Sequence, residues 1–397
     1  MKVSQIKLRG LGQTPETDWI TLDPHLTTIH FQKPFEYTGF FRAIETINPP
    51  YNCQAVQPFA DYPKIIKKNG LTKLVSPEKR TIILSIFEAS SDLVHHLADI
   101  SSLFYETDKI EVGRRFDHSR WTNFIELPSS TRWSEVSADI FSLLDSNLIP
   151  EKRAGFRYVL EALVPSDRIK GDLMNSLSRW LNEMMSAAPQ KEQLLHPLLL
   201  KVNRAQYFKQ ARALLDKHLP LFVRIDIGDG DTNSSCSSLS RLLDIYEKRI
   251  TTIHPGMDRQ DLSFVERLDR EFSELAFLEP DIHICSDKND IKPIISYKGQ
   301  RYKKITMLDN ILQVQIISAL AIVLSRILYS SDPLLIFENS GQKTVPESQW
   351  SLIKQIKKIA DHCQCIFGTG NNEIFSKEHD GIHYRQEEII KEKVRAR

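Results

Sequence analysis

The strongest constraint on this fold is a nearly unbroken apolar run, residues 311–324. A stretch that is apolar on every side predicts a helix buried within a core rather than a surface helix. Polar residues interrupt the run and Arg326 follows it, so the run is too short and too polar to span a bilayer. The rest of the chain must therefore supply enough structure to cover this helix all round.

Two further apolar segments follow the run. Residues 334–337 lead into Glu338 and Asn339, and residues 363–367 lead into residues 368–372, with an amphipathic stretch at 350–360 between them. Short apolar runs that alternate with helical patterns predict parallel strands joined by crossover helices. Ligands of such sheets bind at the carboxyl ends of the strands, so we expect the polar residues after each run to lie at a site.

The N-terminal part alternates apolar and polar residues, as half-buried strands do. We expect strands near residues 2–8, 19–22 and 26–31, then a loop at 32–39 and a helix at 40–47. Further strands are expected near residues 81–87 and 124–128. Together these segments predict a mixed sheet, which we assign to an N-terminal lobe over residues 1–132.

Residues 133–219 show helical spacing, but four prolines cut them into short pieces and Pro220 follows directly. This pattern predicts a compact helical insert over residues 133–280, followed by a C-terminal lobe over residues 281–397. Within the insert, residues 221–226 have the character of a strand. A hairpin is expected at residues 282–297, directly before the apolar run.

Composition sets broad limits on function. The chain has 397 residues with 41% hydrophobic and 26% charged residues, which is ordinary for a soluble globular protein. A net charge of +1 gives no overall attraction to nucleic acid, so any such contact must be local. Five scattered cysteines and an N-terminus without a secretory signal predict a cytoplasmic protein with reduced thiols and no membrane association.

The order of these parts resembles the SMC and RecF-like heads of ABC-type ATPases. In those heads a P-loop follows an N-terminal strand, a signature turn precedes a long helix, and two later strands carry an acidic pair and a polar switch residue. The resemblance implies an α/β fold: a two-lobed, P-loop-type head with a mixed sheet and a compact helical insert. It rests on order and spacing, while the motif letters differ.

The loop at residues 32–39 departs from the P-loop pattern of this family. Laid on that pattern, Thr38 takes the place of the magnesium-binding hydroxyl, and Tyr37 replaces the lysine. Pro34 and Glu36 replace glycines, which removes a backbone N–H and adds a negative charge where phosphates would bind. Lys33 could reach the phosphates from the other side, so the resemblance implies a weakened nucleotide site at Lys33, Tyr37 and Thr38.

The other family motifs are weakened as well. At the signature turn, Thr306 stands for the serine, while Met307 and Leu308 replace glycines. Asp309 is expected to cap the helix that follows, where its charge would repel phosphate. Glu338 takes the metal-binding position, but Asn339 stands where a general-base carboxylate is usual, and an amide cannot take a proton from water. The switch position falls at Gly370 or Asn371. Magnesium would need Thr38 and Glu338, and catalysis would need Glu338, Asn339 and Asn371.

Three functional hypotheses remain open from the sequence. The first is a non-hydrolysing partner or scaffold subunit, without a cofactor, in a DNA repair, chromosome maintenance or phage-defence assembly. It would act as a homodimer or with an intact cassette-type ATPase. The second is a divergent ATPase that binds ATP and Mg²⁺. The third is a DNA-binding module that uses a basic segment with Lys64, Lys67, Lys68, Lys73 and Arg80, helped by Arg114, Arg115 and Arg120.

Overall fold

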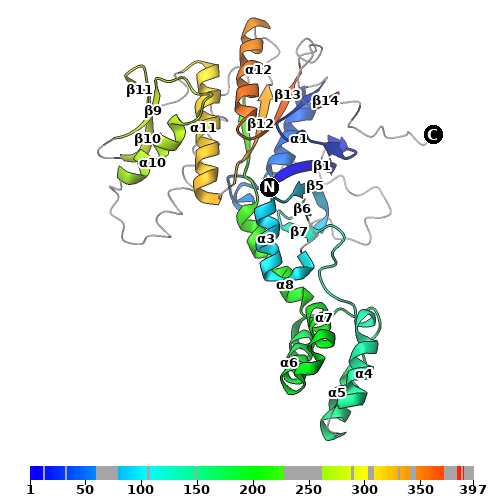
Figure 1. The fold of residues 1–397 in the computed structure, drawn as a ribbon. Helices are drawn as coiled ribbons and strands as arrows, with labels where there is room; N and C mark the ends of the chain where they lie inside the picture. The colour runs from blue at the N-terminus through cyan, green and yellow to red at the C-terminus, as the bar shows by residue number, and fades with distance from the viewer. Residues whose placement is uncertain are drawn as a thin grey trace, which may run out of the picture. The chain divides into compact units, whose positions relative to one another are not determined.

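The computed structural model divides the chain into two compact units (Figure 1). The first comprises residues 1–88, 111–121 and 218–397, and the second comprises residues 89–110 and 122–217. Within them the structure describes residues 1–11, 14–31, 34–59, 79–104, 108–147, 150–227, 262–287, 290–302, 308–329, 331–339, 346–370, 382–385 and 388.

A five-stranded parallel sheet forms the centre of the first unit. Its order is β14 (Ile382–Arg385), β4 (Leu26–His30), β13 (Gln364–Thr369), β12 (Leu334–Asn339) and β8 (Phe222–Asp226). Each neighbouring pair is parallel, with Glu338 opposite Gly368 on one side and Asp226 on the other. Every residue of β4, β12 and β13 is buried, as expected for strands covered on both faces.

Helices lie on both faces of this sheet. Alternate residues of β12 and β13, such as Leu335 and Phe367, share a core with α11 (Asn310–Tyr329) and α12 (Pro346–Ala360). On the opposite face, α1 (Pro34–Glu45) packs against β8 and β12. Strand side chains alternate between faces, so Glu338 lies on the α1 side, whereas Phe337 and Asn339 lie on the α11 and α12 side.

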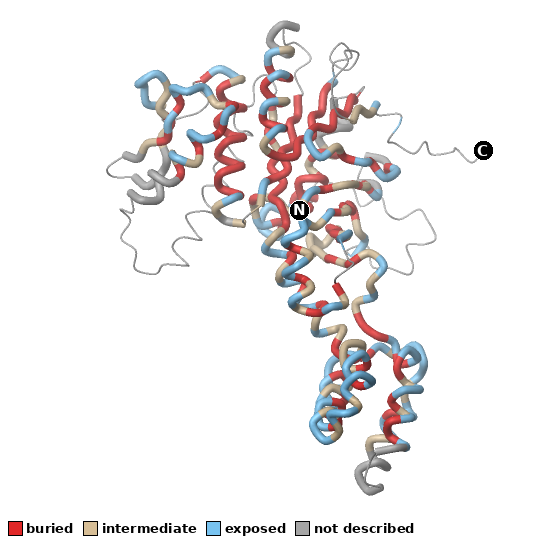
Figure 2. The backbone as a smooth tube through the Cα atoms, in the orientation of Figure 1, coloured by how far each residue is buried: buried red, intermediate tan, exposed pale blue. Residues whose placement is uncertain are grey.

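Helix α11 contains the apolar run and is mostly buried, as are β12 and β13 beside it (Figure 2). Its segment Asn310–Ile327 is long and apolar enough to cross a membrane by length and composition. In this fold 78% of that segment is buried, as in the core helix of a globular domain. The structure thus confirms the buried helix expected from the apolar run.

Two further sheets are present, one of six strands and one of three. One has the order β2 (Thr14–Glu16), β1 (Lys2–Leu11), β5 (Thr81–Glu88), β6 (Lys109–Arg115) and β7 (Arg120–Phe124), with β3 (Ile20–Thr21) also paired to β1. The other is antiparallel, with β9 (Ile282–Asp287), β10 (Asp290–Tyr297) and β11 (Gln300–Tyr302), and α10 (Leu262–Ser273) packs against β9. The latter sheet confirms the hairpin expected before α11.

The second unit is mainly helical. Its core contains large side chains such as Trp133, Leu177 and Trp180, which are all buried. The helices are short, which confirms the compact helical character expected from the proline spacing. They are α3 (Ser91–Ile100), α4 (Ser137–Asn147), α5 (Pro150–Glu161), α6 (Gly171–Ala187), α7 (Glu192–Val202) and α8 (Arg204–His218).

The observed units are divided differently from the expected lobes: residues 89–110 and 122–132 belong to the second unit, and residues 281–397 belong to the first. We assigned residues 26–31 to an N-terminal sheet and residues 221–226 to the insert, but both segments pair within the parallel sheet as β4 and β8. The compact unit around that sheet therefore takes up the two ends of the chain and residues 218–227. Parallel pairing joins segments far apart in sequence, so local patterns did not reveal these neighbours.

Candidate functional site

A buried cluster of three charged side chains joins β8, β12 and α1. Arg224 of β8 donates from Nη1 to Oε2 of Glu338 at 2.7 Å, and its Nε lies 3.6 Å from Oε2 of Glu45 in α1. The exposed fractions of the Glu338 and Glu45 side chains are 1% and 5%. Arg224 therefore places a fixed positive charge between the carboxylate expected to bind metal and a carboxylate of the neighbouring helix.

The charges of this cluster support one another. Burial by itself lowers the pKa of the Arg224 guanidinium, but Glu45 and Glu338 outweigh it and raise that pKa above its ordinary value. The hydroxyl of Tyr51 adds a long hydrogen bond to Glu45, at 3.4 Å. A buried carboxylate needs such a partner because an unpaired charge is strongly disfavoured away from water. Here the partner is a protein side chain.

The connection between β4 and α1 is short. Strand β4 ends at His30 and α1 begins at Pro34, so residues 31–33 alone separate them. We expected a loop that continued to residue 39, and this expectation was wrong. Proline favours the first position of a helix because its fixed φ suits the helix and its missing N–H has no partner there. Pro34 thus starts α1 within the stretch that aligns with a P-loop.

Three aromatic rings pack together at this connection. Phe31, Phe40 and Phe41 are buried, and their ring centroids lie 5.3–5.5 Å apart. Phe31 also continues the strand pairing, since its N–H donates to the carbonyl of Thr369 at 3.0 Å. A phosphate group needs polar donors, and these three rings offer none.

Phe41 fixes the packing of α1 against the centre of the sheet. A Cβ atom built on Gly368 would lie 2.1 Å from Cε2 of Phe41. Gly368 is the partner of Glu338 in the β12–β13 register. Only a residue without a side chain leaves room for the ring, so glycine at 368 serves close packing between helix and strand.

The start of α11 is capped by its own sequence. Oδ1 of Asp309 accepts the N–H of Leu312 at 2.9 Å, and the side chain of Gln313 donates to the carbonyl of Leu308 at 2.7 Å. This confirms the capping role expected for Asp309. The carboxylate adds negative charge at the helix end where the family signature would bind a phosphate, so this end is ill suited to an anion.

A row of polar residues crosses the opposite face of the sheet at its carboxyl end. Asn339 pairs with Thr369, which pairs with His30, and all three are buried. Within the part of the chain that the structure describes, Oδ1 of Asn339 has no hydrogen-bond partner. The row confirms that polar residues gather at this edge, but none of the three supplies a carboxylate for general-base catalysis.

The predicted site residues are only partly brought together. Glu338 and Asn339 end the same strand but lie on opposite faces of the sheet. Tyr37 and Thr38 lie in the first half of α1, and their side chains are outside the described part. Also outside it are Lys33, Thr306 and Asn371, together with the basic segment residues Lys64, Lys67, Lys68 and Lys73.

Two residues of the ion cluster were missed at the sequence level. Arg224 lies in the mainly apolar segment 221–226, and Glu45 lies in the mainly apolar segment 40–47. Isolated charges in segments that are otherwise buried signal an ion pair, because each must find a partner in the core. That signal was present, but it does not say which charges pair.

Arginines near the basic segment have mostly structural roles. We considered Arg114, Arg115 and Arg120 as contacts for DNA phosphates, but Arg114 is buried and donates to the carbonyls of Thr46, Ile47 and His118. Burial lowers the pKa of the Arg114 guanidinium. Arg120 donates to Asn48, so neither Arg114 nor Arg120 is available to a phosphate without losing a contact. Arg80 and its neighbour Lys79 are exposed.

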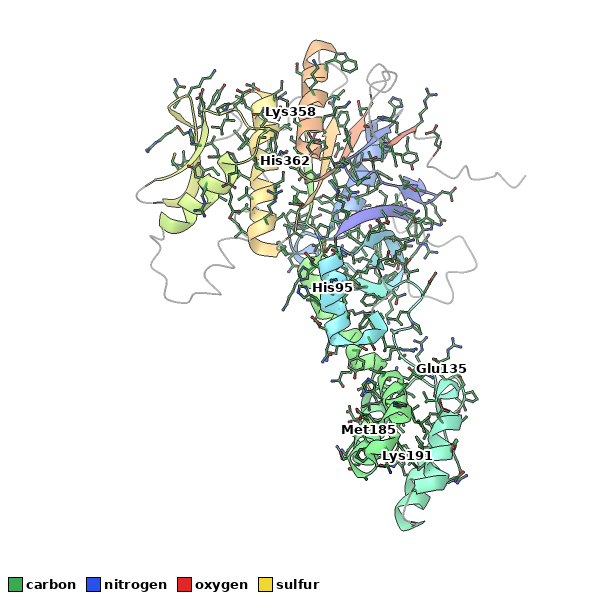
Figure 3. All side chains as sticks on the ribbon, viewed as in Figure 1. His95, Glu135, Met185, Lys191, Lys358 and His362 are labelled. Carbon is green, nitrogen blue, oxygen red and sulfur yellow. The ribbon has the colours of Figure 1, made fainter. Side chains whose placement is uncertain are left out.

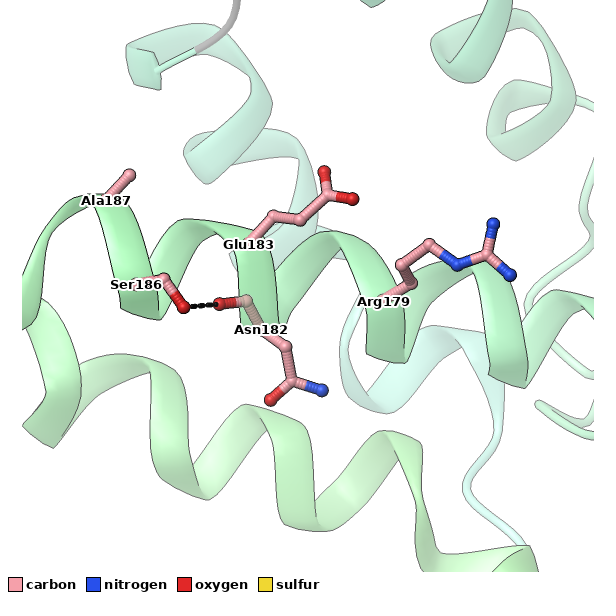
Figure 4. A pocket seen from close by; sticks show the side chains of 5 residues that line it. All are labelled: Arg179, Asn182, Glu183, Ser186 and Ala187. Atoms are coloured by element: carbon pink, nitrogen blue, oxygen red, sulfur yellow. Dashed lines mark hydrogen bonds between the residues drawn. The ribbon is translucent and has the colours of Figure 1, made fainter.

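Side chains elsewhere form no comparable cluster among the described residues. Exposed examples such as Lys358 on α12 and His95 on α3 are labelled in Figure 3. A hollow of about 620 Å³ lies along α6 (Figure 4). Its only internal hydrogen bond in that view runs from Ser186 to the carbonyl of Asn182, and its lining residues are Arg179, Asn182, Glu183, Ser186 and Ala187.

Comparison with solved structures returns the two groups that the sequence order resembles. An SMC head bound to the C-winged helix domain of ScpA has 11% identity and a TM-score of 0.41, covering 94% of this chain and 91% of that chain. The SMC head domain from Thermotoga maritima has 9% identity and a TM-score of 0.35, with coverages of 94% and 91%. The recombination mediator protein RecF of the RecFOR pathway has 10% identity and a TM-score of 0.34, covering 93% of this chain and 92% of that chain.

No family model and no curated protein sequence matches the chain. TM-scores below 0.5 support no inference about chemistry, so the proposal that follows starts from the contacts within this chain.

Proposed function

We propose that this chain is a non-hydrolysing, head-like protein related to the SMC and RecF-like ATPases, acting as a partner or scaffold subunit. The observation that carries this proposal is the contact between Arg224 and Glu338, at 2.7 Å in a buried setting. In the family that the sequence resembles, the residue aligned with Glu338 binds magnesium. Here the guanidinium of Arg224 binds Glu338 instead. The positive charge needed to keep Glu338 buried is thus part of the protein.

Two further contacts support the same proposal. Phe31 after β4 packs against Phe40 and Phe41 in the second half of α1, and the start of α11 is capped by Asp309. Apolar rings and a carboxylate are poor groups for binding phosphate. Phosphoryl transfer needs charge neutralisation and positioning together, so these described residues argue against ATP hydrolysis.

The assembly in which the chain acts is a proposal from resemblance. DNA repair, chromosome maintenance and phage defence are the settings that the resemblance implies, with a second copy or an intact cassette-type ATPase as partner. Purification of the native protein under mild conditions, with identification of co-purifying chains, tests this directly. We expect a stoichiometric partner with complete ATPase motifs or a homodimer. A monomer without any such partner would contradict the scaffold role.

A divergent ATPase is the competing proposal. It would use Lys33, Thr38 and Glu338 in unusual roles, and it requires Arg224 to leave the carboxylate when metal arrives. The two proposals differ in the effect of Glu338→Gln on steady-state ATP hydrolysis. We expect neither the wild-type protein nor the Glu338→Gln variant to hydrolyse ATP above background. Hydrolysis by the wild-type protein that the substitution abolishes would favour the ATPase proposal.

A DNA-binding role is the third proposal, based on the basic segment. Exposure of Lys79 at the end of that segment favours it, whereas the exposed guanidinium of Arg80 already donates to the carbonyl of Arg9 at 3.0 Å. Phosphate contacts make binding strongly dependent on salt. Charge reversal at Lys67 and Lys68 should therefore weaken DNA binding and flatten its salt dependence, whereas unchanged binding would remove this segment from consideration.

A further inference from the structure

The three-stranded sheet of β9, β10 and β11 has one apolar and one polar face. Ile282, Ile284 and Ile295 are buried in the core, with Tyr297 and Tyr302 packed against them. Strand side chains alternate, so residues between these positions point to the other face. That face carries polar side chains that the core does not use.

Three of these polar residues lie side by side across the sheet. In the strand register, Ser296 of β10 is opposite His283 of β9 on one side and opposite Arg301 of β11 on the other. Directly opposite residues have Cβ atoms about 5 Å apart, so a group above Ser296 lies within reach of both neighbours. His283 and Arg301 are exposed, and Ser296 is half-buried.

The members of this row are free to bind a ligand. No hydrogen bond or ion pair engages the side chains of His283, Ser296 or Arg301 within the described part of the chain. By contrast, Lys298 at the hairpin turn already has a partner, because its ammonium lies 4.9 Å from the centroid of the Tyr297 ring. Among the described side chains of this sheet, the row is therefore a polar surface without a partner.

We infer that the His283–Ser296–Arg301 row binds a phosphate monoester. Arginine offers a planar fork of donors that suits phosphate oxygens, the serine hydroxyl adds a central donor, and imidazole adds a third. A monoester offers three terminal acceptor oxygens to these three donors, whereas a diester offers two. The ligand is either a free phosphate compound or a phosphorylated side chain.

Acidic neighbours limit the strength of this site without excluding it. Asp281 is exposed and lies two residues before His283, so it shares the polar face of β9. Its backbone carbonyl accepts the N–H of Lys298 at 3.3 Å, which keeps that cation at the same end of the hairpin. Asp269 is engaged elsewhere, because its Oδ1 accepts the N–H of Ile284 at 2.7 Å.

The test is calorimetric titration of the full chain with inorganic phosphate, phosphoserine and dimethyl phosphate. We expect saturable binding of inorganic phosphate or phosphoserine, and Arg301→Gln should weaken it about tenfold or more because a charge-assisted pair is lost. Ser296→Ala and His283→Gln should each weaken it by a smaller factor. Tighter binding of phosphoserine than of inorganic phosphate would indicate a phosphorylated side chain as ligand; preference for inorganic phosphate would indicate a free compound.

A matched control is available on the same hairpin. Lys298→Gln removes an exposed positive charge near the row without removing a row residue, so it should leave affinity nearly unchanged. Melting temperature of each variant checks that the sheet remains folded. The inference is overturned if neither inorganic phosphate nor phosphoserine binds saturably, if dimethyl phosphate binds as tightly, or if Lys298→Gln weakens binding as much as Arg301→Gln.

Discussion

Arg224 and Glu338 lie on adjacent parallel strands, and the guanidinium Nη1 donates to the carboxylate Oε2 at 2.7 Å. Glu45 approaches the same guanidinium from α1, at 3.6 Å. The arrangement ties the helix after the first parallel strand to the strand that ends in Glu338. It makes a protein cation, rather than a bound ion, the counter-charge for both acids.

Removal of Arg224 should destabilise the protein. We expect Arg224→Met to lower the free energy of unfolding by about 3–5 kcal/mol, because two buried carboxylates lose their partner. Chemical denaturation measures this, and Arg224→Met combined with Glu45→Gln and Glu338→Gln should recover part of the loss. A single variant within about 0.5 kcal/mol of wild type would show that the cluster contributes little.

Because Phe41 packs directly against Gly368, we expect substitutions at these two positions to have coupled effects on stability. Gly368→Ala should cost about 1–3 kcal/mol because its methyl group meets the ring, and Phe41→Ala about 3–5 kcal/mol because it leaves a cavity. The double variant should be less destabilised than the sum, since the added methyl group then fills part of the cavity. Strict additivity in denaturation experiments would argue against this contact.

His118 predicts a loss of stability in mildly acidic solution. Burial lowers the pKa of its imidazole below the ordinary 6.5, with Arg114 acting in the same direction. Between that lowered pKa and 6.5 the unfolded chain binds more protons than the folded chain, so stability falls as pH drops through this window. The His118→Asn variant should show a flatter dependence of melting temperature on pH.

The matched control for this prediction is His95→Asn, which changes an exposed histidine on α3. It should keep the wild-type pH dependence. A flattening of the same size in both variants would assign the effect to something other than the surroundings of His118.

The buried thiols predict a difference in reactivity. Burial raises the pKa of the Cys365 thiol well above its ordinary value, and hydrogen bonding to Cys363 acts in the same direction. Cys285 is only half-buried. A thiol-specific reagent should therefore modify Cys285 in the folded protein and Cys365 only after denaturation, as peptide mass mapping can show. Rapid labelling of Cys365 under native conditions would contradict its placement.

Much of this fold could be predicted from local pattern. The apolar run predicted α11, the apolar segments before Glu338 and Gly368 predicted β12 and β13, and Asp309 was expected to cap α11. These features depend on neighbouring residues, so periodicity and capping chemistry reveal them.

The rest depended on pairings between distant segments. Nothing local assigns β8 beside β12, and without that neighbour Arg224 cannot be matched to Glu338. The early start of α1 at Pro34 was also missed, because the family pattern suggested a loop where proline favours a helix start. The candidate site was thus foreseen at one carboxylate, while its counter-charge was not.

Calorimetric titration of ATP with Mg²⁺ into the wild-type chain tests the central claim most directly. The internal pairing of Glu338 with Arg224 predicts no saturable, magnesium-dependent binding up to about 1 mM, the top of the usual range for enzyme substrates. Micromolar binding that Glu338→Gln or Thr38→Ala abolishes, while the control Glu45→Gln leaves it intact, would contradict the claim.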